Sequence, residues 1–115
     1  MSISVTDLEI LGQTALQEFS DRIARGERIE DRDVERPAQR LEAKLEQLYA
    51  VAATMAQREP TLEGVTAIWA RMVSICDSMS KALSDLHPGK TPHSDSYDRI
   101  LDIRNACEEN RLLHA

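Results

Sequence analysis

Three histidines, two cysteines and one glycine-lysine-threonine triplet are the first residues of this chain to consider for metal binding or catalysis. Bundle enzymes that hold two metal ions use Glu-x-x-His, because this spacing puts both ligands on the same side of a helix. The histidines here are His87, His93 and His114, and serine, lysine and arginine occupy the positions three residues before them. The spacing therefore predicts no metal centre of this class.

The two cysteines, Cys76 and Cys107, each fall at an apolar position of their segment. Neither belongs to a Cys-x-x-Cys pair, so the usual pattern of a zinc site is missing. Buried cysteine commonly acts as a small apolar side chain. We expect both in the core, and the alternatives are a disulfide, a reactive thiol or a site shared with His114.

Gly89-Lys90-Thr91 matches the end of a phosphate-binding loop. Such a loop also needs a glycine five positions before Gly89 and a strand in front of it. Ser84 occupies that earlier position and no strand is expected, so we interpret the triplet as part of a turn. Because no catalytic group of residues is found, we expect the protein not to be an enzyme and to need no cofactor or metal.

Length and charge narrow the class of protein further. The 115 residues suffice for one domain, 1–115, with a core of its own. The formal charge of −6 disfavours a nucleic-acid partner, whose phosphates are negative. No apolar run reaches the ~20 residues that cross a bilayer, and the N-terminus lacks the pattern of a signal peptide. We expect a soluble, cytoplasmic domain with no membrane partner.

Two stretches repeat apolar residues at alternating steps of three and four, the spacing that keeps side chains on one side of a helix. The first contains Val34, Ala38, Leu41, Leu45, Leu48, Ala52 and Met55, and the second contains Leu62, Val65, Trp69, Met72, Cys76, Met79, Leu83 and Leu86. Only Glu59-Pro60-Thr61 separates them, and so short a connection favours antiparallel neighbours. The pattern predicts a long helical hairpin. Its central core residues are Leu45, Leu48, Met72 and Met79.

Shorter amphipathic segments precede and follow this hairpin. Thr6 and Glu9 have the spacing of a capping box, which predicts the start of a first helix, and Gly26 predicts its end. The apolar face of that helix contains Leu8, Leu11, Ala15, Phe19 and Ile23. A last helix is expected to begin within 94–96, with an inner face that contains Tyr97, Ile100, Ile103, Cys107 and Leu113.

The hairpin needs more than one further helix to cover it. Ile68, Ile75 and Ala82 flank the main stripe of the second stretch and make it wider than the seam of a two-stranded coiled coil. We therefore predict an all-α fold, an antiparallel up-down bundle of four helices centred on a long helical hairpin. Thr61 is expected to cap the second helix of the hairpin, and Pro37 to lie in the first turn of its first helix.

The end of the hairpin is apolar nearly all the way round. This hairpin tip comprises residues 48–56 of the first stretch and 67–70 of the second. Either the first and last helices cover it, or its small residues admit a second subunit. We predict the second case, a homodimer whose partner-binding residues are Tyr49, Ala50, Ala53, Ala67 and Ala70.

The functional expectation follows from the missing catalytic groups and from this tip. We expect a non-enzymatic helical protein-protein interaction module, such as an adaptor, a small regulator or an assembly subunit. The alternative is a small-molecule or metal-binding bundle with a cavity near Trp69, Met72, Cys76 and Cys107. Native mass spectrometry would separate the two, because a retained ligand or metal supports the alternative.

Overall fold

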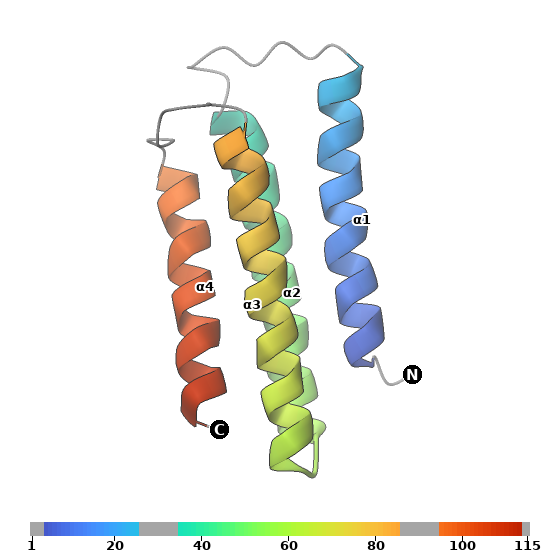
Figure 1. Ribbon diagram of the computed structural model, residues 1–115, viewed down its shortest axis with the longest axis vertical. Coiled ribbons are helices and arrows are strands. Elements are labelled where there is room, and N and C mark those ends of the chain that lie inside the picture. The colour runs from blue at the N-terminus through green and yellow to red at the C-terminus, as the bar shows by residue number, and fades with distance from the viewer. Residues whose placement is uncertain (1–3, 26–34, 86–94, 114–115) are drawn as a thin grey trace.

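A computed structural model describes residues 4–25, 35–85 and 95–113 and contains four helices. They are α1 (Val5–Ala24), α2 (Glu35–Arg58), α3 (Leu62–Asp85) and α4 (Asp95–Leu113). Successive helices run in opposite directions, as Figure 1 shows, and α2 and α3 form the long hairpin. The predicted all-α, antiparallel bundle is confirmed. None of these described helices is both long and apolar enough to cross a membrane.

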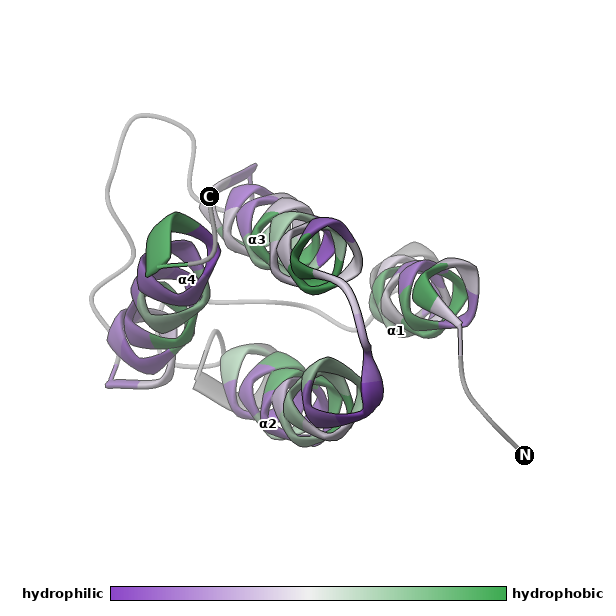
Figure 2. Cartoon of the chain, turned by 90° about the horizontal axis from the view of Figure 1, so that it is seen from below, coloured by the Kyte–Doolittle hydropathy of each residue, from purple (hydrophilic) through white to green (hydrophobic). Residues whose placement is uncertain are grey.

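The hairpin forms the middle of the bundle. In the described residues α1 contacts α2 and α3, α4 contacts the same two helices, and α1 and α4 do not touch (Figure 2). Ion pairs at the surface join helices: Arg71 of α3 with Glu9 of α1 at 3.1 Å, Arg99 of α4 with Glu46 of α2 at 3.4 Å, and Arg104 of α4 with Asp77 of α3 at 3.1 Å. Exposed pairs of this kind add little stability, so the apolar contacts with the hairpin hold α1 and α4 in place.

The start of α1 differs from the prediction. Ser4 Oγ accepts a hydrogen bond of 3.2 Å from the backbone N–H of Asp7, and the Ser4 N–H donates to the Asp7 carboxylate at 2.9 Å. Ser4 is therefore the N-cap, and the predicted box of Thr6 and Glu9 is wrong by two residues. The pKa of the Asp7 carboxyl is lowered by these hydrogen bonds from Ser4, which favour its charged form.

The turn between α2 and α3 is closed by side chains. Thr61 Oγ1 accepts a hydrogen bond of 3.1 Å from the backbone N–H of Gly64, which confirms Thr61 as the N-cap of α3. Its hydroxyl in turn donates to the Glu59 carboxylate at 3.2 Å. Pro37 lies in the first turn of α2, as predicted. Gly26 lies outside the described residues, and so do Val34 and Leu86.

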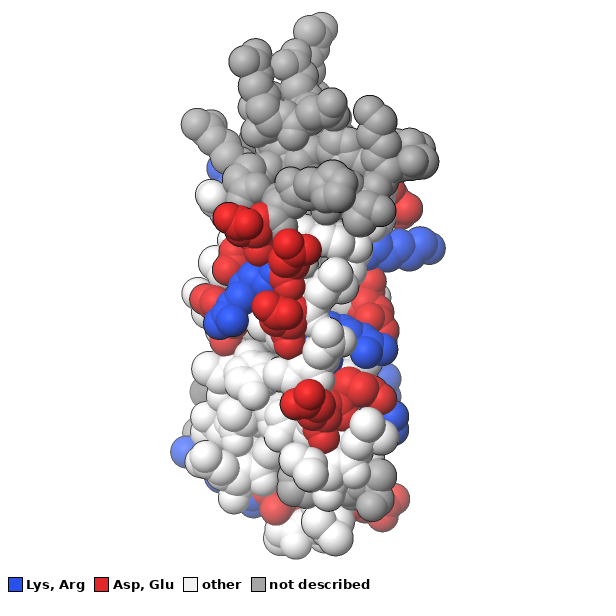
Figure 3. Space-filling view, turned by 90° about the vertical axis from the view of Figure 1, so that its left-hand side faces the viewer, with Lys and Arg blue, Asp and Glu red and all other residues white. Residues whose placement is uncertain are grey.

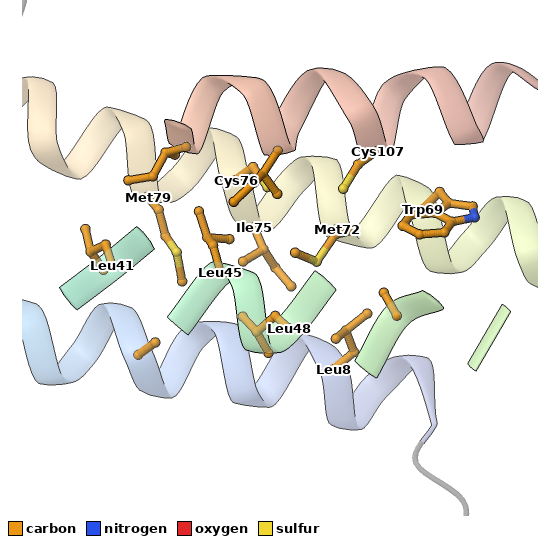
Figure 4. Close-up of a cluster of buried hydrophobic side chains, with 14 of the residues drawn as sticks. Leu8, Leu41, Leu45, Leu48, Trp69, Met72, Ile75, Cys76, Met79 and Cys107 are labelled. Atoms are coloured by element: carbon orange, nitrogen blue, oxygen red, sulfur yellow. The ribbon is translucent and has the colours of Figure 1, made fainter. Parts of the chain in front are cut away.

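The core is aliphatic and lies along the hairpin. The four residues predicted at its centre are at most 2% exposed, which confirms the register of both helices (Figure 4). Ile68 and Ile75 are also buried, and Ala82 is half-buried. The stripe of α3 is therefore as wide as a bundle of four helices requires.

Three residues predicted to face inward are exposed: Leu11 at 41%, Leu62 at 68% and Leu113 at 79%. Leu62 begins α3 where the hairpin projects beyond the ends of α1 and α4, so no helix covers it (Figure 1). Leu113 is the last residue of α4. Leu11 lies beside the strip that packs, since the buried residues among the described side chains of α1 are Leu8, Gly12, Ala15 and Phe19.

That strip of α1 is narrow and has small residues in its middle. An added Cβ at Gly12 would come within 2.9 Å of three atoms of the Ile75 side chain, closer than real Cβ contacts. The missing side chain at Gly12 thus allows α1 to lie directly against α3. Glycine is needed at this position for space and not for a left-handed backbone conformation, because Gly12 lies within the regular helix.

Candidate interaction surface

The cysteines face each other between α3 and α4. Cys76 and Cys107 are both free and 0% exposed, and Cys107 points from α4 toward α3 in Figure 4. The pKa of the Cys76 thiol is raised, first by its hydrogen bond with the Cys107 thiol and then by burial. Both effects favour the neutral thiol, which is a poor nucleophile and a poor metal ligand. The prediction that both cysteines belong to the core is confirmed.

We expect neither cysteine to react with an aromatic disulfide reagent at pH 8 while the protein is folded. Both should react after denaturation, when the thiols reach water and the pKa of the Cys76 thiol returns to its ordinary range. Absorbance of the released thiolate measures this. The control is Ser78→Cys, which places a thiol at an exposed position of α3 and should add one that reacts promptly. Rapid labelling of the unaltered folded protein would contradict the buried pair.

A metal site receives no support from the described residues. No group of three His, Cys, Asp or Glu side chains within them is arranged to hold a metal ion. The three histidines lie outside the described residues. Of the residues considered for a cavity, Met72, Cys76 and Cys107 are 0% exposed within the core, whereas Trp69 lines an open groove.

An open groove lies instead between α2 and α4 and continues to the hairpin tip. Its first part, of about 400 Å³, is lined by Glu46, Tyr49, Arg99, Asp102, Ile103 and Ala106. Its second part, of about 360 Å³, is lined by Tyr49, Ala53, Ala56, Gln57, Val65, Trp69 and Asn110. Tyr49 lines both parts, so the two adjoin at this residue, and together they are called the groove.

The two parts differ in chemistry. In the first, Arg99 forms an ion pair with Glu46 at 3.4 Å, and Asp102 adds a second carboxylate. In the second, which no charged residue lines, the rings of Tyr49 and Trp69 lie 5.6 Å apart at an angle of 48°. Tilted aromatic pairs at this separation attract each other beyond the area that they bury. The pair therefore holds the groove in shape where α2 meets α3.

The outer side of α2 beside this groove lacks charge for about three turns. No residue from Gln47 to Gln57 is charged, and Figure 3, which faces the side of α4, shows a broad uncharged area below the charged residues there. Ala50 and Thr54 are exposed within it. A helix face in contact with water normally carries charged side chains, so this face has the composition of a contact surface.

The structure places the predicted partner-binding residues in two groups. Tyr49 and Ala53 are half-buried and line the groove together, while Ala50 is exposed on the outer side of α2. Ala67 and Ala70 are exposed on α3 and are not among the residues that line the groove. The rest of the tip is partly covered within the chain: Ala52 is buried, and Val51, Met55 and Ala56 are half-buried against the core.

Residues of α4 were missed by the sequence analysis. The α4 wall of the groove consists of Arg99, Asp102, Ile103, Ala106 and Asn110, of which only Ile103 was expected to face inward. Ala106 and Asn110 follow Ile103 at steps of three and four. That helical spacing was the only feature of the sequence that could have placed Ala106 and Asn110 on the same side of α4 as Ile103.

No family model matches the chain, and neither a curated protein nor a solved structure matches it. Function is therefore inferred from the fold and from this surface.

Proposed function

We propose that the protein is a non-enzymatic interaction module of the cytoplasm that works as a homodimer. The observation that carries the proposal is the outer side of α2, which is uncharged from Gln47 to Gln57 and borders an open groove. An adaptor, a small regulator and an assembly subunit all act through such helix faces. The two free, buried cysteines fit a reducing compartment.

Small side chains make this face suited to another helix. Ala50 and Ala53 let two backbones approach closely, and the neighbouring aromatic pair offers a rigid apolar surface at the edge of the contact. Pairing by a twofold axis covers the same face on both copies, so the assembly closes as a dimer without growing into a fibre. Ala67 and Ala70 of α3 stay predicted contacts of the same dimer.

Light scattering coupled to size-exclusion chromatography tests the proposal. We expect the unaltered protein to have the mass of a dimer at tens of micromolar, and Ala50→Glu to have the mass of a folded monomer, because the new carboxylate would be buried without a partner. Ser78→Glu is the matched control, since it adds the same charge on the exposed side of α3 and should leave the dimer intact. Ala70→Glu then reports whether α3 shares in the contact.

A monomer of the unaltered protein at high micromolar concentration would contradict the proposal. Circular dichroism shows whether each variant is folded. Because Ala50 is exposed, Ala50→Glu should keep its helix content. It should also unfold at nearly the same denaturant concentration as the unaltered protein diluted until it is monomeric.

A further inference from the structure

The exposed residues of α2 around the uncharged stretch follow a symmetric order. Between residues 46 and 58 they are Glu46, Gln47, Ala50, Thr54, Gln57 and Arg58. Counted outward from Ala52, they form three pairs at equal distance: Ala50 with Thr54, Gln47 with Gln57, and Glu46 with Arg58. Any exposed helix stripe has regular spacing, but here the chemistry of each pair is also complementary.

An antiparallel pair of helices would use this order. If a twofold axis perpendicular to α2 lies level with the buried Ala52, on the opposite and exposed side of the helix, each residue comes to the level of the residue at equal distance on the other side of Ala52 in the second copy. A small residue then meets a small residue at the centre, an amide meets an amide, and Glu46 meets Arg58 at each end. The six residues span about 18 Å at 1.5 Å per residue.

The charges decide between the two directions that the helices could take. In a parallel pair each residue would face its own copy, which places Arg58 beside Arg58. In the antiparallel pair Arg58 approaches the end of the groove, where the carboxylates of Glu46 and Asp102 outnumber the guanidinium of Arg99 by one charge. Arg58 is exposed and forms no ion pair with the described residues, so it is free to make this contact.

We propose that two copies of this chain pair α2 against α2 in antiparallel orientation about a twofold axis level with Ala52, with Arg58 of each copy against Glu46 and Asp102 of the other. This inference rests on the proposed homodimer and adds its direction and register. The second copy is the only occupant proposed for this face.

Charge reversal with mixing tests the register. Arg58→Glu and Glu46→Lys should each weaken self-association about tenfold, because each creates two like-charge contacts per dimer. An equimolar mixture of the two variants should restore association. In the mixed dimer the glutamate introduced at position 58 of one chain meets the lysine introduced at position 46 of the other, and the second contact is the original one. Sedimentation equilibrium measures the dissociation constants.

Three comparisons keep the result specific. Lys81→Glu makes the same change of charge at an exposed position of α3 and should leave the dimer unaffected. Arg58→Gln removes the charge without reversing it and should give a smaller loss than Arg58→Glu. Added salt should weaken the unaltered dimer and strengthen the two like-charge variants, because it screens both attraction and repulsion.

The outcomes separate this inference from the proposed function. If the unaltered protein is a monomer, both fail. If it is a dimer that Ala50→Glu dissociates, but the charge variants associate normally or their mixture gives no gain, the antiparallel register is overturned while the homodimer stands. Restored association in the mixture supports the register.

Discussion

Replacing Leu48 with alanine is expected to lower the free energy of unfolding by about 2–5 kcal/mol. Leu48 is 2% exposed, and its side chain lies in the core among residues of α1 and α3 (Figure 4). Alanine removes three carbon atoms and leaves a cavity that the close-packed helices on both sides cannot fill. Denaturation by urea, followed by circular dichroism at 222 nm, measures the loss.

Leu62→Ala is the matched control for this experiment. It makes the same chemical change at a position that is 68% exposed, where little apolar surface leaves water on folding, and should cost less than about half a kcal/mol. Both variants are compared at one protein concentration, because the proposed dimerisation would add to apparent stability. If Leu48→Ala proved as mild as the control, the inner face of α2 would be wrongly assigned.

Replacing Gly12 with leucine is expected to lower the free energy of unfolding by about 1–3 kcal/mol, although leucine favours a helix more than glycine does. Its Cβ alone would come within 2.9 Å of the Ile75 side chain, so the larger side chain must push α1 away from α3. The loss of contact would expose Leu8 and Phe19, which are now buried. The same urea titration measures this change.

A double-mutant cycle with Ile75→Ala shows whether the cost arises at this contact. In the Ile75→Ala background the new leucine can occupy the vacated space, so Gly12→Leu should cost less there than in the unaltered protein. Equal costs in both backgrounds would falsify the close packing of α1 on α3. Gln13→Leu, at the next and exposed position of α1, should have little effect and serves as the control.

The central hairpin could be predicted in detail because its evidence is local. Apolar residues at steps of three and four determine which side of a helix faces inward, and Thr61 has the side chain that caps α3. The edges of the bundle carry weaker local evidence. At α1 the contact with α3 is made at Gly12, and a residue without a side chain leaves no apolar signal, so Leu11 was assigned inward in its place.

The candidate surface could be predicted only in part, for a related reason. Its composition on α2 was visible as an uncharged stretch, and Tyr49 and Ala53 do lie together in the groove. Which residues of α4 stand opposite depends on how far that helix is shifted along its neighbours. No periodicity within one helix contains this information, so Ala106 and Asn110 were not identified.

The lack of contact between α1 and α4 has a consequence for how the folded chain fluctuates. Because α1 touches only α2 and α3 among the described residues, it can lift away while the other three helices keep all their mutual contacts. Such an opening breaks fewer contacts than global unfolding and therefore costs less free energy. The backbone amides of α1 should accordingly exchange with solvent deuterium through an opening of lower free energy than the amides of α3, which packs against α1 as well as against α2 and α4.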